Sequence, residues 1–486
     1  MYAEISGEVR PTITDWNSPF MKGPFTPNYV EYTATDLEVI GKVPERLDGV
    51  YLRNTQNPVH QPLGIHHAFD GDGMLHMLSF KNGQVEYRNR FLRTKGFMEE
   101  QAAGHALYAG LIDNPKLSQR AGWGARGGLK DTSATDVIVH AGSALTTFYQ
   151  CGEPYRFDAR TLEPLGVSKW GERVMKDNGI SAHPKVCPRT GDLLFFNYSK
   201  QAPYMFYGEV DAQDQLMHYV PVPLPGPRLP HDMMFTENFA ILDDFPLHWD
   251  ESLLAQGKHK LSYFENKPSR FAVVPRRHAP QNGVKWFEAS PTYVLHWLNA
   301  WEEGDEIVLH GYHQEHPMPK LGYDSTGATL GPERYAPTLY EWRLNLRTGA
   351  VKERRMHERY LEFGMVNASF WGQPYRYSYN MIAHPNHFLF DGIVRFDHTT
   401  GQMHEYRFGE GRFGSESPMA PALDAQSEDD GYVVSFVSDM NTDQSECVVL
   451  DARDISKGPV ARIMLPHRIS SGTHACWADG REIRGG

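Results

Sequence analysis

Residues 342–354 read WRLNLRTGAVKER, two short runs with alternating or apolar character on either side of Thr348-Gly349. Successive side chains of a β-strand point to opposite faces, so two such runs around a turn dipeptide predict an antiparallel hairpin. The same pattern recurs at residues 78–87, 393–406 and 447–465. The strongest helical pattern spans residues 99–110, and few other segments show one. Many hairpins with few helices predict an all-β protein built as a propeller, a sandwich or a barrel.

The chain length bounds the number of domains. With 486 residues, 40% of them apolar, the chain is long enough for two or three average domains or for one large β architecture. Segments rich in proline and glycine, such as residues 221–230, have the character of loops and not of linkers between domains. We therefore expect a single domain over residues 1–486, with residues 1–32 as an N-terminal extension.

Charge and cysteine usage restrict the partners and the compartment. The formal net charge is −12, which argues against a nucleic-acid partner because such a protein needs a basic surface. The four cysteines are scattered and form no Cys-x-x-Cys pair, which is typical of a reduced chain. The first ten residues lack the apolar core of a secretory signal, and no run of about eighteen apolar residues predicts a transmembrane segment. A cytoplasmic protein is the expectation.

Four histidines, far apart in the sequence, each stand in a short polar and aromatic motif. The chain has 23 histidines, and any one of them is more often a surface or core residue than a metal ligand. Their spacing matches no local ligand motif, but the inner strands of separate propeller blades converge on one axis, where distant residues can meet. The four are His183 in SAHPK (181–185), His231 in PHDMM (230–234), His296 in HWLNAWE (296–302) and His474 in GTHACW (472–477).

In this order the four motifs resemble the iron ligands of the carotenoid cleavage oxygenase family, which includes apocarotenoid-cleaving enzymes, lignostilbene dioxygenases and isoeugenol-type monooxygenases. The resemblance extends from about Thr33 to Trp477. It implies a seven-bladed β-propeller with loops and short helices over the active-site face. It also implies an enzyme that uses non-haem Fe(2+) and O2 to cleave a conjugated C=C double bond into two carbonyl products. The implied iron ligands are His183, His231, His296 and His474.

The resemblance also implies glutamates that accept the second ring N–H of ligand histidines, a contact that orients the imidazole. Glu362 and Glu416 stand at two of these family positions. The first family glutamate falls in register on Gln150, and Glu153, three residues later, is the alternative. The amide oxygen of Gln150 can accept an N–H but carries no charge.

Tyr149 is the candidate substrate-binding residue, and it stands where lignostilbene and isoeugenol enzymes have a lysine thought to engage the substrate phenol. A tyrosine hydroxyl can hydrogen-bond a phenol but supplies no cation. The mean hydropathy is −0.51, and no dense apolar segment indicates a membrane surface. The sequence therefore slightly favours an aromatic alkene, such as a stilbenoid or a propenyl or vinyl phenol. The alternative is an apocarotenoid or carotenoid, a substrate class compatible with peripheral membrane contact.

Other function classes remain open. A non-catalytic propeller that binds partners and keeps its histidines for packing would contain no metal, so metal analysis separates it from an oxygenase. Family members of the isomerase type split an ester instead of an alkene. A serine hydrolase is not indicated, because the chain has no Gly-x-Ser-x-Gly motif.

Overall fold

The hairpin at residues 342–354 is present in the computed structural model of the chain, which describes residues 2–125, 127–256, 260–278, 283–318, 335–385 and 387–483. Strand β23 (Pro337–Asn345) pairs antiparallel with β24 (Val351–Arg355). The turn contains Gly349 with φ +79°, in the left-handed region that favours glycine. The other three predicted hairpins also form, as the strand pairs β5–β6, β27–β28 and β32–β33.

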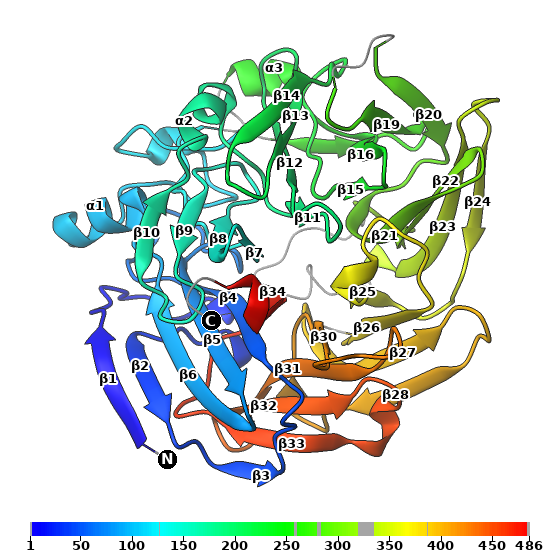
Figure 1. Cartoon of the computed structure of the whole chain (residues 1–486). Helices are drawn as coiled ribbons and strands as arrows, with labels where there is room; N and C mark the ends of the chain where they lie inside the picture. The colour runs from blue at the N-terminus through cyan, green and yellow to red at the C-terminus, as the bar shows by residue number, and fades with distance from the viewer. Residues whose placement is uncertain are drawn as a thin grey trace.

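Seven of the eight sheets formed by the described strands are arranged as the blades of a β-propeller (Figure 1), so the predicted fold is confirmed. One blade closes the ring with strands from both ends of the chain: β1 (Tyr2–Glu8), β2 (Val30–Thr35), β4 (Gly49–Asn57), β5 (Asp72–Lys81), β6 (Gln84–Phe91) and β34 (Gly472–Asp479). The blade beside it at the C-terminal end contains β29 (Arg412–Phe413), β30 (Met419–Pro421), β31 (Gly431–Asp439), β32 (Gln444–Asp451), β33 (Pro459–Met464) and β3 (Val39–Gly41).

The other blades have four strands each over the described residues, with the first strand innermost in each. They are β7 (Asp136–His140), β8 (Ser143–Thr147), β9 (Tyr155–Phe157) and β10 (Pro164–Val167); β11 (Lys185–Val186), β12 (Leu193–Tyr198), β13 (Met205–Val210) and β14 (Leu216–Pro221); β15 (Met234–Phe235), β16 (Phe239–Asp244), β19 (Ser269–Pro275) and β20 (Lys285–Ala289); β21 (Val294–Glu303), β22 (Glu306–Gln314), β23 and β24; and β25 (Leu361–Met365), β26 (Tyr377–Ala383), β27 (Phe390–Asp397) and β28 (Met403–Arg407).

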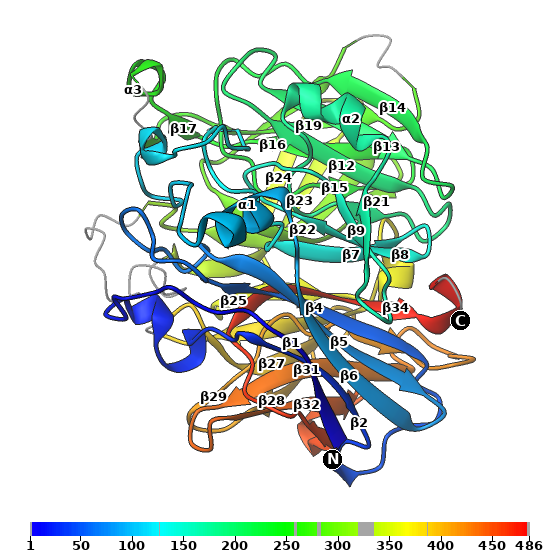
Figure 2. The ribbon, with the colours of Figure 1, turned by 90° about the vertical axis from the view of Figure 1, so that its left-hand side faces the viewer.

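Helices and short elements lie outside the blades. The α-helices of the described chain are α1 (Lys95–Ala103), α2 (Gly171–Val174) and α3 (Glu251–Ala255), and an extra hairpin pairs β17 (Leu247–Trp249) with β18 (Leu261–Tyr263). Short 3-10 turns are η1 (Pro19–Met21), η2 (Gly23–Phe25), η3 (Pro115–Leu117), η4 (Met175–Asp177), η6 (Ala368–Phe370), η7 (Ile455–Lys457) and η8 (Gly480–Glu482). Helix α3 and the turns near the N-terminus project toward one face, and the C-terminal end lies toward the other (Figure 2).

The helix predicted at residues 99–110 forms, but both of its predicted bounds were wrong. Helix α1 begins at Lys95 because the Thr94 side chain accepts a hydrogen bond from the Phe97 amide and caps the helix. It ends at Ala103 because Gly104 takes a left-handed conformation with φ +74°. No helix among the described residues is long and apolar enough to span a membrane.

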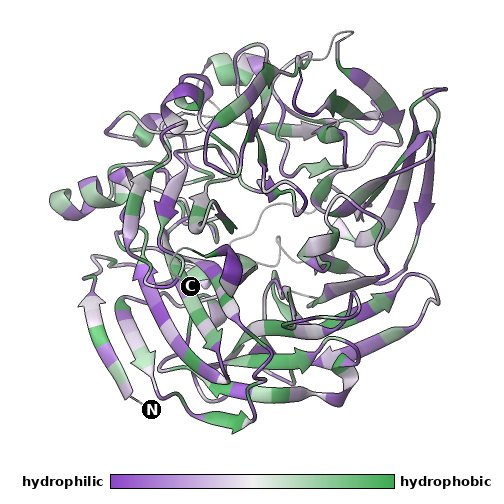
Figure 3. Ribbon diagram, in the orientation of Figure 1, coloured by the Kyte–Doolittle hydropathy of each residue, from purple (hydrophilic) through white to green (hydrophobic). Residues whose placement is uncertain are grey.

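The ring is held closed by pairing between segments from the two ends of the chain. Strand β34 pairs antiparallel with β4, and Trp477 lies opposite Tyr51. The Tyr51 ring packs at 4.5 Å between centroids against Phe436 of the neighbouring blade. Hydrophobic and hydrophilic residues alternate along many strands (Figure 3), so each blade presents apolar side chains to its neighbours. Burial of these side chains between blades stabilises the disc.

Candidate metal centre

The four histidines predicted as ligands lie together at the propeller axis. Each is at or just before the innermost strand of a different blade. Four separate blades therefore each bring one histidine to the axis. Because a propeller packs its inner strands around one axis, residues that are far apart in sequence become neighbours. The pairs of histidine and strand are His183 with β11, His231 with β15, His296 with β21 and His474 with β34.

The geometry of this histidine cluster fits a metal ion. One ring nitrogen from each of the four side chains can be chosen so that all four lie within 4.8 Å of one another. The Nε2 atoms of His183 and His296 are buried and have no hydrogen-bond partner among the described residues. A buried polar atom without a partner is destabilising. A cation bound by the cluster would provide a partner for both Nε2 atoms.

The protonation state of three of the four histidines also favours a cation. Burial, followed by the proximity of the other cluster histidines, lowers the pKa of His183 and of His231 well below the usual value. Burial likewise lowers the pKa of His296 to about 3. The neutral imidazole is the form that binds a metal.

Two carboxylates contact the outer nitrogens of the cluster. Glu362, on β25, lies with Oε2 2.6 Å from Nδ1 of His296, which leaves Nε2 to face the cluster. Glu416 lies with Oε2 3.3 Å from Nδ1 of His474 and also accepts a hydrogen bond from the Ala475 amide. These are the placements expected from the sequence, and the orienting role of both residues remains a prediction.

Gln150 and Glu153 differ in their surroundings. Gln150 is buried, and its Oε1 atom has no hydrogen-bond partner among the described residues. The two carboxylate oxygens of Glu153 are occupied by Lys95 Nζ at 2.6 Å and by the Tyr155 hydroxyl at 2.9 Å. The structure therefore gives Glu153 a role in anchoring α1 and leaves Gln150 as the residue nearest in register to the family glutamate.

An acidic residue that sequence reasoning missed lies beside the cluster. Asp136, the first residue of β7, has Oδ2 3.7 Å from Nδ1 of His183 and accepts a hydrogen bond from the His183 amide at 3.1 Å. A signal was present in the sequence, because an aspartate at the start of an apolar strand run is unusual. Its partner could not be inferred, since 47 residues separate the two.

Burial changes the acidity of these carboxyl groups. It raises the pKa of Glu362 to about 8 and that of Asp136 to about 6. A cation held by the histidines would lower both values, because an opposite charge nearby favours the ionised form. Next to them, Lys185 forms an ion pair of 2.8 Å with Asp232, so these two charges largely compensate each other.

Aromatic side chains line one side of the histidine cluster. The Tyr149 ring lies 5.7 Å from the ring of His231, between centroids. The Phe363 ring lies 4.5 Å from that of His296 and 4.9 Å from that of His474. These rings form an apolar wall beside the candidate metal position.

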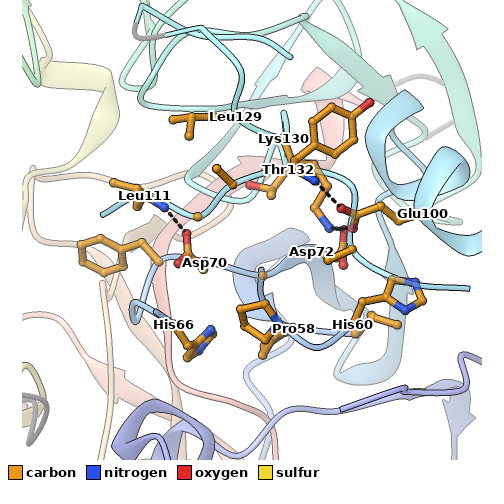
Figure 4. Close-up of a pocket in the computed structure, with 18 of the residues that line it drawn as sticks. Pro58, His60, His66, Asp70, Asp72, Glu100, Leu111, Leu129, Lys130 and Thr132 are labelled. Atoms are coloured by element: carbon orange, nitrogen blue, oxygen red, sulfur yellow. Dashed lines mark hydrogen bonds and ion pairs between the residues drawn. The ribbon is translucent and has the colours of Figure 1, made fainter. Parts of the chain in front are cut away.

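A cavity lies beyond this wall, and none of the four histidines is among its lining residues (Figure 4). One of its lining residues, Phe148, packs against Tyr149, and another, Phe69, reaches Phe363 through Phe388. The cavity also has polar walls: Lys130 lies between Glu100 and Asp72, and further polar lining residues are His60, Asp70 and Tyr108.

Comparisons with known proteins identify related proteins that match nearly the whole chain. Residues 25–479 match the family model described as retinal pigment epithelial membrane protein. The chain is 32% identical to carotenoid 9,10(9',10')-cleavage dioxygenase 1 of Arabidopsis thaliana, over 96% of this chain and 90% of the relative. It is 30% identical to isoeugenol monooxygenase of Pseudomonas nitroreducens, over 95% and 98%. Among solved structures, the lignostilbene dioxygenase of Pseudomonas brassicacearum superposes with a TM-score of 0.85 at 27% identity, covering 97% of this chain and 100% of that one.

The contact between Glu362 and His296 yields a testable prediction. We expect Glu362→Gln to weaken metal binding about 10- to 100-fold, the usual effect of changing a group that orients a ligand, while the fold stays intact. Metal affinity would be measured by competition with a chromophoric chelator. Glu341→Gln is a matched control, because Glu341 contacts His310 on outer strands at 3.3 Å and should leave the affinity unchanged. An unchanged affinity for Glu362→Gln would contradict the assigned role.

Proposed function

The chain belongs to the carotenoid cleavage oxygenase family, and on that premise we propose that it is an Fe(2+)-dependent oxygenase whose preferred substrate is an aromatic alkene. As in its relatives, the reaction class is oxidative cleavage of an alkene with O2, here giving two carbonyl products. The observation that carries the proposal is the cluster of four histidines, three buried and His231 half-buried, with ligand nitrogens within 4.8 Å. The proposed iron ligands are His183, His231, His296 and His474.

The donor set supports iron over a structural zinc site. Imidazole suits several divalent metals, but four neutral donors leave the full charge on the ion. Fe(2+) prefers more than four ligands, whereas structural zinc sites are closed by four and usually contain cysteine. When bound, Fe(2+) supplies the one-electron chemistry that dioxygen needs in order to react with a closed-shell alkene.

The residues of the chain hold the substrate and exclude water. Phe363 and Tyr149 lie beside the cluster, so the double bond of a flat substrate bound there would pack against these rings. Glu362 and Glu416 hold His296 and His474 in the orientation that presents Nε2 to the ion. No proton donor is required of these groups, because cleavage of a double bond by O2 transfers no net protons.

The walls of the cavity support an aromatic alkene with a polar end. The buried ionic cluster of Lys130, Glu100 and Asp72 makes this wall polar, and an unsubstituted polyene has no group that could hydrogen-bond to it. A phenolic or methoxylated ring can hydrogen-bond to such a wall. Pockets for mainly apolar ligands contain few polar groups, placed where the ligand has its own.

Two observations favour the alternative, a carotenoid or apocarotenoid substrate. One relative with 32% identity is named a carotenoid cleavage dioxygenase. Large exposed apolar side chains also lie on the segment 65–117, which supplies many of the cavity's lining residues, and these would suit peripheral contact with a membrane: Ile65, Met98, Ile112 and Leu117. The cytoplasmic location, the single domain over residues 1–486 and the lack of a nucleic-acid partner stay predictions.

A direct test compares three substrates on protein reconstituted with Fe(2+): a 4-hydroxystilbene, its methyl ether and an apocarotenal. We expect two carbonyl products from the phenol in air without NADH or a flavin, because the alkene itself supplies the electrons, and none under anaerobic conditions. A site that hydrogen-bonds a hydroxyl rejects analogues without one, so the ether should react at least tenfold more slowly. Turnover without oxygen, or a strict need for NADH, would contradict the proposed reaction.

Tyr149→Phe identifies the group that recognises the phenol. Losing one hydrogen bond costs about 0.5–1.5 kcal/mol, so the preference for phenol over ether should shrink about 2- to 13-fold. If the apocarotenal is the better substrate and Tyr149→Phe has no effect, the substrate is the carotenoid alternative. Equal rates on the phenol and the ether in the unmodified protein would remove phenol recognition altogether.

A further inference from the structure

The carboxylates around the histidine cluster are unevenly distributed. His296 contacts Glu362 and His474 contacts Glu416, whereas the family register for a third glutamate is occupied by the neutral Gln150. A buried divalent cation is stabilised by negative charge close to its ligands. The centre therefore lacks a charge at Gln150 unless another acidic residue provides it.

Asp136, on the same blade as Gln150, is placed to provide that charge. It opens the innermost strand β7, and one of its oxygens, Oδ2, lies 3.7 Å from Nδ1 of His183. Its other oxygen, Oδ1, accepts a hydrogen bond from the Val137 amide at 2.7 Å, which fixes the carboxylate in place. The unpartnered Nε2 of His183 is the other nitrogen of the same ring.

Asp136 also contacts the backbone of this histidine. His183 has φ +64°, in the left-handed region that non-glycine residues seldom occupy. This conformation persists only where the surroundings hold it. The hydrogen bond from the His183 amide to Oδ2 of Asp136, 3.1 Å long, is such a restraint. One carboxylate thus contacts both the main chain and the ring of His183.

We propose that Asp136 is the third carboxylate of the metal centre: it positions His183 and supplies the negative charge that Gln150 does not. The proposal rests on the proposed metal site. It makes Asp136 a positioning residue that acts through His183 and does not touch the substrate. Three carboxylates, each from a different blade, then each contact a different histidine of the cluster.

The test measures Co(2+) affinity and the visible spectrum of bound Co(2+), neither of which depends on turnover. We expect Asp136→Asn to lower the affinity about 10- to 100-fold, as for other residues that orient a ligand, and to change the absorption bands of the bound ion. Gln150→Glu alone should keep or raise the affinity. In the double variant Asp136→Asn/Gln150→Glu, the returned charge should restore at least half of the lost affinity on a logarithmic scale.

Controls separate this proposal from the proposed function and from misfolding. Asp192→Asn changes a buried aspartate on the blade of His183, which contacts Arg277 at 3.1 Å, and should leave Co(2+) affinity unchanged. Thermal unfolding of the metal-free variants checks the fold. An affinity of Asp136→Asn within twofold of the unmodified protein would overturn the positioning role, and no recovery in the double variant would overturn the charge replacement. If the unmodified protein binds no metal, the proposed function itself fails.

Discussion

His296→Ala is expected to abolish both metal binding and alkene cleavage. The variant loses one of four donors, and it also leaves the carboxylate of Glu362 buried without the imidazole that it contacts at 2.6 Å. Losing a ligand should cost more than the roughly 10- to 100-fold typical of changing a group behind a ligand. We expect less than one hundredth of the metal affinity, measured by chelator competition, and no carbonyl product above background.

A buried histidine outside the cluster provides the control for this experiment. His218→Ala removes a side chain that packs against Tyr207 on the outer strands of another blade. It should keep the metal and the activity even if the protein melts at a lower temperature. Full activity of His296→Ala would disprove the ligand assignment and with it the proposed metal centre.

Gly364→Ala is expected to destabilise the protein and to weaken metal binding together. Gly364 lies on β25, two residues after Glu362, and a Cβ atom there would overlap the buried hydroxyl of Tyr312 and lie 2.8 Å from Oδ1 of Asn380. Overpacking a rigid core costs typically about 1–3 kcal/mol. Because relief requires β25 to move, Glu362 moves with it. Thermal unfolding and Co(2+) affinity measure the two effects.

A second substitution tests whether the overlap is the cause. The Tyr312 hydroxyl donates a hydrogen bond of 2.6 Å to Asn380, so Tyr312→Phe alone should cost about 1 kcal/mol. Combined with Gly364→Ala, it removes the overlapping oxygen and should recover part of the stability and of the metal affinity. Such non-additivity is expected only between residues in contact. An unchanged melting temperature for Gly364→Ala would refute the steric argument.

Local sequence patterns determined the elements of the blades. Alternating side chains and turn residues such as Thr348-Gly349 act within about a dozen residues, so the hairpins were predictable from single segments. The helix at residues 99–110 was misplaced because its true start depends on one side chain, Thr94, that caps the first turn. Choosing a propeller over a sandwich or a barrel required the resemblance of the histidine motifs to a known family.

The sequence by itself therefore determined the strand pattern, the identity of the four histidines and the two glutamates at matching positions. Only the tertiary structure decided that these histidines share one cluster, that both oxygens of Glu153 are occupied elsewhere and that Asp136 lies beside His183. The physical reason is that contacts at the axis join blades separated by tens to hundreds of residues. No periodicity within one segment encodes such contacts, which exist only after the inner strands have packed around a common axis.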